Sequence, residues 1–183
     1  MQKKILLDSC TYFRLARSII PLLNIEFGKE KFCLYIIKEF EVEYNKNPRL
    51  KNKFDWILEP EHIKERQSII QVKGKELYDI ECAFSFIFSA GRRNGLSPID
   101  AKALAVAYIL KIPLVSDDNA VLKEGSKFQI KTMTSLELLK LMVDNNHIKY
   151  SKVKEIVSCW AYENELPMGK NKFIVNVAKV VLK

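Results

Sequence analysis

Carboxylates stand at positions in this chain where they can act together. Asp8 directly follows a short apolar run, and Asp117 and Asp118 follow another. Asp100 lies near the start of an alanine-rich helical pattern that precedes the second run. In an open parallel sheet, ligands bind just beyond the carboxyl ends of the strands. We therefore expect these acids to gather at one edge of a sheet.

The chemistry that suits such a group is the binding of a divalent cation. Mg²⁺ and Mn²⁺ prefer hard oxygen ligands, and carboxylates held together without a cation repel one another. A bound ion lowers the pKa of water, and two ions about 4 Å apart stabilise both the attacking and the leaving oxygens of a phosphodiester. The competing interpretation is helix capping, which suits Asp8 and Asp118 individually, with Asp100 as the partner of a Ser97 cap. Because three caps at one sheet edge are a less economical explanation, we favour metal ligation.

The elements that position these acids can be read from the same stretch. Ser97 and Pro98 predict a helix start, and alternating alanines from 101 to 107 give that helix a thin side that can lie close to a sheet. Pro113 ends it, and Leu114-Val115 is a short apolar strand. The pattern therefore predicts a helix followed by a strand that delivers the paired acids.

The N-terminal part repeats this design. Residues 5–7 predict a strand ending in Asp8, and Thr11–Leu23 predicts a helix. Residues 32–37 read as a second buried strand, and 38–47 as a helix. The acids of that helix are Glu39, Glu41 and Glu43, of which the first and last share a face.

These motifs resemble those of the PIN-domain nucleases. The resemblance extends from about Lys4 to Leu141, and its most specific part is the pair of motifs whose acids lie 18 residues apart. The matching stretches are ILLDS at 5–9, VEY at 42–44, IDAKALAVA at 99–107 and PLVSDD at 113–118.

The resemblance implies a three-layer α/β/α fold with a central, mainly parallel sheet. It also implies a Mg²⁺- or Mn²⁺-dependent ribonuclease that leaves a 5′ phosphate. The implied catalytic metal ligands are Asp8, Glu43, Asp100 and Asp118, with Ser9 and Ser116 as supporting hydroxyls. Asp117 departs from the common pattern and either joins the site or replaces Asp118 in part.

Partners and domain limits follow from the same resemblance. Many stand-alone proteins of this family are toxins inhibited by a small cognate antitoxin protein. The match gives a nuclease domain over 1–145, with a helical cap at 45–95. The unmatched extension at 146–183 could pack on the domain, on a second copy in a homodimer, or on a partner.

Composition agrees with an RNA-binding protein. The 183 residues carry a net charge of +8, which favours a polyanionic partner, although a lysine-rich genome gives the same bias. The four cysteines are scattered and only two histidines occur, so a zinc site is not expected. No signal peptide or membrane-length apolar run is visible, so we expect a cytoplasmic protein that does not enter membranes.

Basic residues near the acids are the candidates for RNA contact. Arg14 and Arg17 follow Asp8, and Arg92 and Arg93 precede Ser97, so we predict that both pairs border the cleft. The basic stretch 45–53 could bind RNA together with the aromatics behind it, but a solvated loop is the simpler interpretation.

The remaining pattern completes the fold. We expect helices at 61–72, 75–94, 135–144 and 150–162, a strand at 128–130, and either a helix or a strand from Phe173. The apolar cluster expected to be largely buried in the second of these helices is Cys82, Ala83, Phe84, Phe86, Ile87 and Phe88.

Two other classes of function remain open. A catalytically silent RNA- or protein-binding module on the same fold would keep the basic surface without needing every acid. A phosphatase with an aspartate nucleophile also begins with a strand that ends in Asp, but it usually has a second Asp two residues on, where this chain has Cys10.

Overall fold

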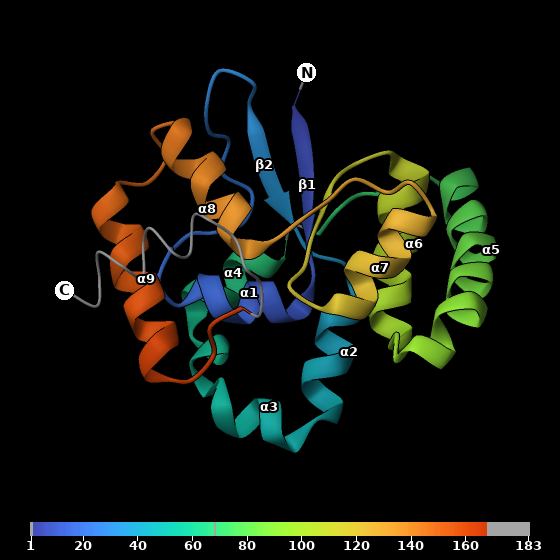
Figure 1. Cartoon of the computed structure of the whole chain (residues 1–183), viewed down its shortest axis with the longest axis horizontal. Coiled ribbons are helices and arrows are strands. Elements are labelled where there is room, and N and C mark those ends of the chain that lie inside the picture. The colour runs from blue at the N-terminus through green and yellow to red at the C-terminus, as the bar shows by residue number, and fades with distance from the viewer. Residues whose placement is uncertain (1, 68, 168–183) are drawn as a thin grey trace.

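The computed structural model describes residues 2–67 and 69–167, whose strands form a four-stranded parallel sheet at the centre (Figure 1). The order across the sheet is β2-β1-β3-β4, and every neighbouring pair is parallel. The strands are β1 (Lys3–Leu7), β2 (Phe32–Tyr35), β3 (Leu114–Val115) and β4 (Thr132–Met133). The chain therefore crosses over between strands through helices, as a parallel sheet requires.

The helices fill the segments between and after these strands. The α-helices are α1 (Ser9–Ala16), α2 (Glu39–Lys46), α3 (Pro48–Lys53), α4 (Pro60–Arg66), α5 (Gly74–Gly91), α6 (Pro98–Leu110), α7 (Asn119–Lys127), α8 (Ser135–Asp144) and α9 (Tyr150–Tyr162). Two short 3₁₀ helices are η1 (Asp55–Leu58) and η2 (Arg92–Asn94).

Two hydrophobic cores, one on each face of the sheet, make the fold a three-layer α/β/α structure. Ile5 and Leu7 of β1 belong to one core, and Leu6 between them belongs to the other. This alternation is the normal period of a strand buried on both faces. Helices α1, α8 and α9 contribute to the first core and α5, α6 and α7 to the second, on opposite sides of the sheet in Figure 1. The predicted fold class is confirmed.

Helix α6 is the best-specified element, and it starts and ends as the sequence predicts. Ser97 is its N-cap and accepts a hydrogen bond from the backbone N–H of Asp100, while Pro98 occupies the first turn. Lys111 ends it in the left-handed conformation. Its alanines are buried. Gly91 at the end of α5 lets the side chain of Leu96, just before α6, pack against the backbone, since a Cβ at Gly91 would lie 2.5 Å from Cδ2 of Leu96.

Helix α9, in the C-terminal extension, packs onto the first core. Val153, Ile156, Val157 and Trp160 are buried together with residues of α1 and α8. The expected helices at 135–144 and 150–162 are both confirmed. The tail from Phe173 lies outside the described residues.

Two predictions about the first half of the chain are wrong. The helix expected to reach Leu23 ends at Ala16, and farther along the chain the backbone N–H groups of Leu22 and Leu23 donate to the Glu65 carboxylate rather than to helical carbonyls. The stretch 45–53 is partly helical rather than a loop. Asn47 caps α3 by accepting from two backbone N–H groups, and proline at its first position favours the helix.

Three further predictions need correction. The expected strand at 128–130 is a turn, and the strand β4 begins two residues later. The helix expected at 61–72 is the shorter α4. The apolar cluster of α5 is not largely buried: Ile87 is covered by the rest of the fold, but Phe86 is 69% exposed, because α6 covers only one side of that helix. Within the described residues, no helix combines the length and apolar character needed to cross a membrane.

Candidate functional site

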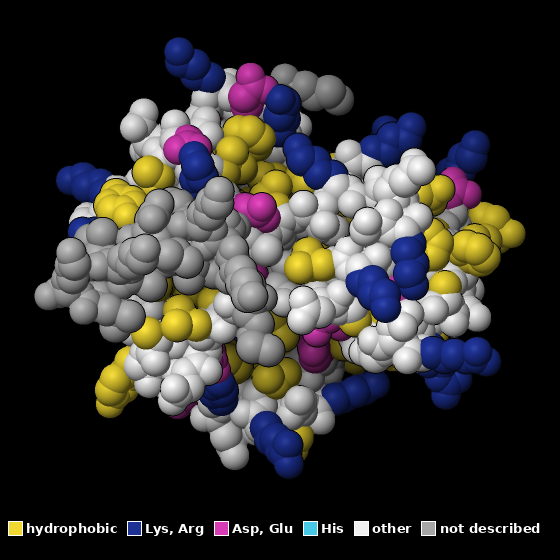
Figure 2. Space-filling model, viewed as in Figure 1, with side chains coloured by type: hydrophobic (Ala, Val, Ile, Leu, Met, Phe, Trp, Pro, Cys, Tyr) yellow, Lys and Arg dark blue, Asp and Glu magenta, His cyan; other side chains and the backbone are white. Residues whose placement is uncertain are grey.

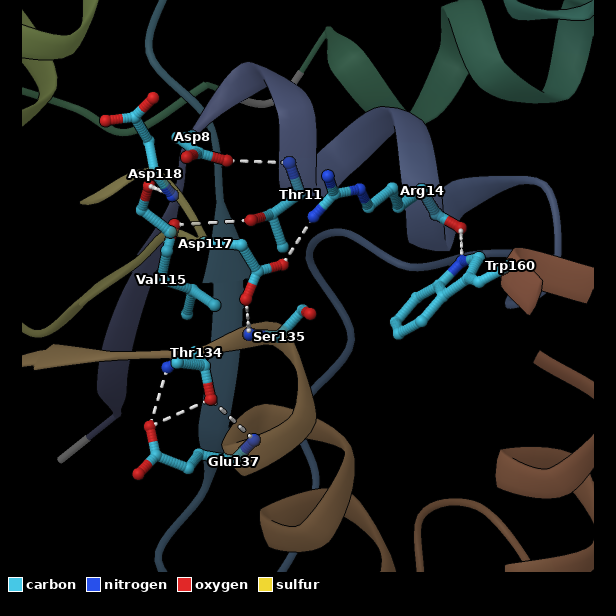
Figure 3. Close-up of polar contacts among 11 residues, drawn as sticks. Asp8, Thr11, Arg14, Val115, Asp117, Asp118, Thr134, Ser135, Glu137 and Trp160 are labelled. Carbon is cyan, nitrogen blue, oxygen red and sulfur yellow. Dashed lines mark hydrogen bonds and ion pairs between the residues drawn. The ribbon is translucent and has the colours of Figure 1, made fainter. Parts of the chain in front are cut away.

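The ends of β1 and β3 bring two of the predicted acids to one edge of the sheet. These strands are neighbours with Leu7 opposite Val115, so Asp8 and the acids after Ser116 leave the sheet side by side. Figure 3 shows Asp8 and Asp118 near each other, beyond the strands. On the molecular surface, acidic side chains lie in the hollow at the lower middle of Figure 2.

Asp8 is a buried helix cap with a strongly perturbed carboxyl group. Its Oδ1 accepts a hydrogen bond from the backbone N–H of Thr11 at 2.6 Å, and the residue is 4% exposed. Burial raises the pKa of Asp8 to about 6, and the nearby charge of Asp100 adds to the rise. Hydrogen bonds with Ser116 and Thr11 oppose that shift. Burial therefore makes ionisation of the Asp8 carboxyl group unfavourable, and a nearby cation would offset that free-energy cost.

Asp100 lies beside Asp8 at the start of α6. Its Oδ2 accepts a hydrogen bond from the Ser97 hydroxyl at 2.7 Å. Burial raises the pKa of Asp100, and the charges of Asp118 and Glu43 raise it further, while the Ser97 hydrogen bonds lower it. These effects place the carboxylates of Asp8, Asp118 and Glu43 within electrostatic reach of Asp100.

Asp118 caps α7 in the way that Asp8 caps α1. Its Oδ1 accepts from the backbone N–H groups of Ala120 at 2.6 Å and Val121 at 3.1 Å. In the described part of the chain, hydrogen bonds to this carboxylate reach only Oδ1. The residue is exposed, so its other oxygen is open to solvent.

Glu43 comes from α2 and carries an unsatisfied oxygen. Its Oε2 is buried and has no hydrogen-bond partner among the described residues. By contrast, Glu41 on another face of the same helix accepts a hydrogen bond from Nε of Arg66 at 2.7 Å. A buried oxygen without a partner destabilises the fold unless something outside the chain satisfies it.

Asp117 has both carboxylate oxygens occupied by the protein itself. Oδ2 accepts from Arg14 at 2.7 Å and Oδ1 accepts from the backbone N–H of Ser135 at 3.0 Å (Figure 3). The backbone carbonyl of Arg14 accepts in turn from the indole of Trp160 at 3.3 Å. Asp117 thus joins α1 to the start of α8, and α9 is attached through Arg14. Sequence reasoning missed this pair, since nothing marks a contact between residues 103 positions apart.

The two predicted supporting serines are both buried. The Ser116 hydroxyl accepts from the backbone N–H of Asp118 at 3.1 Å and also lowers the pKa of Asp8, so it joins the two strand ends. Ser9 is the first residue of α1, directly after the Asp8 cap.

The other predicted basic residues are exposed. Arg17 lies 4.0 Å from Glu163 of the segment after α9. Arg92 and Arg93 form η2 together with Asn94, whose side chain donates to Glu124 of α7 at 2.8 Å. Their contact with RNA stays a prediction.

The acidic side chains of the described residues do not form a complete metal-binding site as they stand. Among residues 2–67 and 69–167, no group of three or more His, Cys, Asp or Glu side chains converges closely enough to hold a metal ion as they stand. Their charges nevertheless act on one another, as the raised pKa values of Asp8 and Asp100 show.

Comparison with known proteins gives a distant structural likeness. No protein-family model and no curated protein sequence matches the chain. Among solved structures, the chain is similar to the crystal structure of FitAcB from Neisseria gonorrhoeae, with 14% sequence identity and a TM-score of 0.44. The alignment covers 72% of this chain and 97% of that one.

Proposed function

We propose that this protein is a Mg²⁺- or Mn²⁺-dependent endoribonuclease. The observation that carries the proposal is that three carboxylates from separate segments, those of Asp8, Glu43 and Asp118, lie within electrostatic reach of the Asp100 carboxylate. One of them is buried with its pKa raised to about 6, and another leaves a buried oxygen without a hydrogen-bond partner among the described residues. The motif resemblance to PIN-domain nucleases supports the same activity.

The residues present fit a hard divalent cation. Each of Asp8, Asp100 and Asp118 accepts a hydrogen bond on one oxygen to stabilise a helix start, and Glu43 presents its unsatisfied Oε2. These oxygen donors match the ligand preference of Mg²⁺, which usually keeps several waters and needs few protein ligands. We therefore assign Asp8, Glu43, Asp100 and Asp118 as the residues that would hold the ion.

The neighbouring residues have positioning roles in this proposal. Capping fixes the carboxylates of Asp8 and Asp118 against their helices, and Ser116 joins the two strand ends. Arg14 holds Asp117 away from the other acids, so we assign Asp118 rather than Asp117 as the ligand. When bound, the metal supplies charge stabilisation for the phosphodiester and lowers the pKa of water.

RNA is the proposed substrate, and a protein inhibitor is a proposed partner. The net charge of +8 favours a polyanion, because basic residues release counterions from phosphates. The PIN resemblance extends to toxins that a small antitoxin protein inhibits, and we propose this relationship as one to be tested.

A second candidate is a catalytically silent RNA- or protein-binding module. It is favoured by the absence of a finished metal cage among the described residues. Under this alternative, the basic surface is retained while the acids act only as helix caps.

One experiment separates the two. The purified protein is incubated with a mixed RNA pool in Mg²⁺, Mn²⁺ or EDTA, and metal binding is measured by calorimetry. We expect cleavage with 5′-phosphate ends in either metal and none in EDTA, together with an increase in melting temperature on metal addition. RNA binding without cleavage and without metal binding would establish the silent module instead.

A further inference from the structure

A groove runs beside the acidic centre, between α2 and the start of α6. Its volume is about 530 Å³, and its apolar lining comes from Val42, Pro48, Pro98 and Ile99. Glu43 and Lys46 of α2 complete the wall. The groove therefore combines apolar surface, a carboxylate of the proposed metal centre and a cation.

The groove is continuous with the proposed metal centre. Glu43 belongs to both, and Ser97, which also lines the groove, donates a hydrogen bond to Asp100 at 2.7 Å. A chain that lay in the groove would continue directly over the acids.

The apolar lining is accessible from outside. Val42 is 46% exposed on a helix whose other outward positions are mostly charged or polar, and no helix start requires it. The two prolines are explained by their places at the starts of α3 and α6, but they still present flat apolar surface to the groove. Such surface can pack against the face of an unstacked nucleobase, because apolar side chains as well as aromatic ones enclose bases in protein pockets.

The charge at the groove differs from that at another cavity. The second cavity lies between α1, η1 and α9, and its basic residues are already paired, Arg17 with Glu163 and Lys53 with Glu165. Lys46, in contrast, forms no ion pair among residues 2–67 and 69–167. The groove beside α2 therefore has a cation, unpaired among the described residues, available for a phosphate.

We propose that this groove binds the nucleotide next to the scissile phosphate of single-stranded RNA. The base lies against Val42 and Ile99, and Lys46 contacts the adjoining phosphate. The inference rests on the proposed nuclease function, since it takes its direction from the acids at the end of the groove. A base must be unstacked to enter, so single strands bind and duplexes do not.

Two substitutions test the groove, each with a matched control. Val42→Ser removes apolar surface, and Ile63→Ser is its control because Ile63 is 42% exposed on α4, outside the groove. Lys46→Glu reverses a charge, and Lys75→Glu makes the same change at an exposed site on α5. We expect each groove variant to raise KM for a short fluorogenic single-stranded RNA about five- to tenfold with kcat nearly unchanged. The controls should match the wild type, and thermal melting verifies that all four variants fold.

Photocrosslinking locates the RNA without relying on cleavage. A 4-thiouridine oligonucleotide is irradiated with the wild-type protein in EDTA, and the crosslinked peptides are identified by mass spectrometry. We expect crosslinks within residues 42–48 or 97–99, and a single-stranded competitor should reduce them more than a duplex does. Crosslinks confined to other segments, or equal effects of the groove and control variants, would overturn the groove while leaving the nuclease intact. Groove crosslinks in a protein that cleaves no RNA would instead refute the nuclease and keep the groove.

Discussion

Two groups of enclosed carboxylates in this protein have opposite surroundings. Glu65 of α4 is buried, yet its Oε1 accepts from the Tyr12 hydroxyl at 2.7 Å, and its Oε2 accepts from the backbone N–H groups of Leu22 and Leu23. At the sheet edge, Asp8 has its pKa raised to about 6 and Glu43 leaves an oxygen without a partner.

Under the proposed function, the difference separates an acid that serves the fold from acids that serve a ligand. Donors from α1 and from the segment after it satisfy Glu65, so adding a cation there would gain nothing. At the sheet edge, burial and neighbouring acidic charge raise the pKa of Asp8 and of Asp100, which is the arrangement expected where a cation completes the site.

The largest expected effect is the loss of cleavage in Asp100→Asn. Asparagine keeps an oxygen that can accept from Ser97 but removes the charge, so the fold should persist while activity falls about a thousandfold, equivalent to about 4 kcal/mol. RNA cleavage in Mn²⁺ measures the first effect and urea unfolding the second. The exposed Asp144→Asn is the control and should behave as the wild type. A destabilised Asp100→Asn protein that still cleaves RNA would show that Asp100 is only a capping residue.

The second-largest effect is on the free energy of unfolding. Replacing Glu65 should lower it, whereas replacing an acid at the sheet edge should not. Glu65→Leu strands the Tyr12 hydroxyl and two buried backbone donors, so it should lower the free energy of unfolding by about 3 kcal/mol. Glu43→Leu removes an unsatisfied oxygen and should leave the metal-free protein unchanged or more stable. Urea unfolding in EDTA compares the two. Equal losses would remove the distinction between the groups.

A pH effect should follow from Asp8. Its pKa is raised from 3.8 to about 6 by burial, so the folded state binds its proton more tightly than the unfolded state does. This contribution to stability is fully present below pH 3.8 and is lost as the pH rises through about 6. Over that window the metal-free wild type should lose stability on the order of 2 kcal/mol relative to Asp8→Asn. Saturating Mn²⁺ should reverse the trend, because it binds the ionised form; a parallel pH dependence of the two proteins would contradict the raised pKa.

The smallest effect should come from the pair of Asp117 and Arg14. Because the two side chains bond to each other, Asp117→Asn and Arg14→Gln should each reduce metal affinity and cleavage about tenfold or less. Their double variant should be no worse than either single one, since both changes remove one interaction. Calorimetry with Mn²⁺ gives the affinities. A much larger loss in Asp117→Asn alone would make Asp117 a ligand itself.

The sequence predicted the elements whose ends carry local signals. Ser97 and Pro98 mark the start of α6, and Thr134 with Glu137 forms the capping box that starts α8. The two-residue strand β3 was predictable because its apolar pair lies between a proline and the acids. These features depend on neighbours in the chain, so reading the sequence is enough to find them.

Several failures depend on contacts between distant segments. The backbone at Leu22 and Leu23, where a helix was expected, is held by Glu65 more than forty positions away. The exposure of Phe86 depends on which face of α5 packs against α6, and an all-round apolar pattern does not specify that face. In the candidate site, the sequence suggested the acids, but neither the engagement of Asp117 by Arg14 nor the unsatisfied oxygen of Glu43 has a local signal.

The double use of the capping acids bears on how this protein could evolve. Asp8 and Asp118 each begin a helix, and replacing such a cap with alanine costs about 1 kcal/mol whether or not the protein is an enzyme. If the proposed nuclease function holds, a descendant that lost RNA cleavage would therefore still be selected to keep both. Glu43 begins no helix, and its buried oxygen is a burden when no ion is bound. Among homologues, a change at Glu43 is thus the informative mark of lost catalysis, while an unchanged Asp8 records only that the protein still folds.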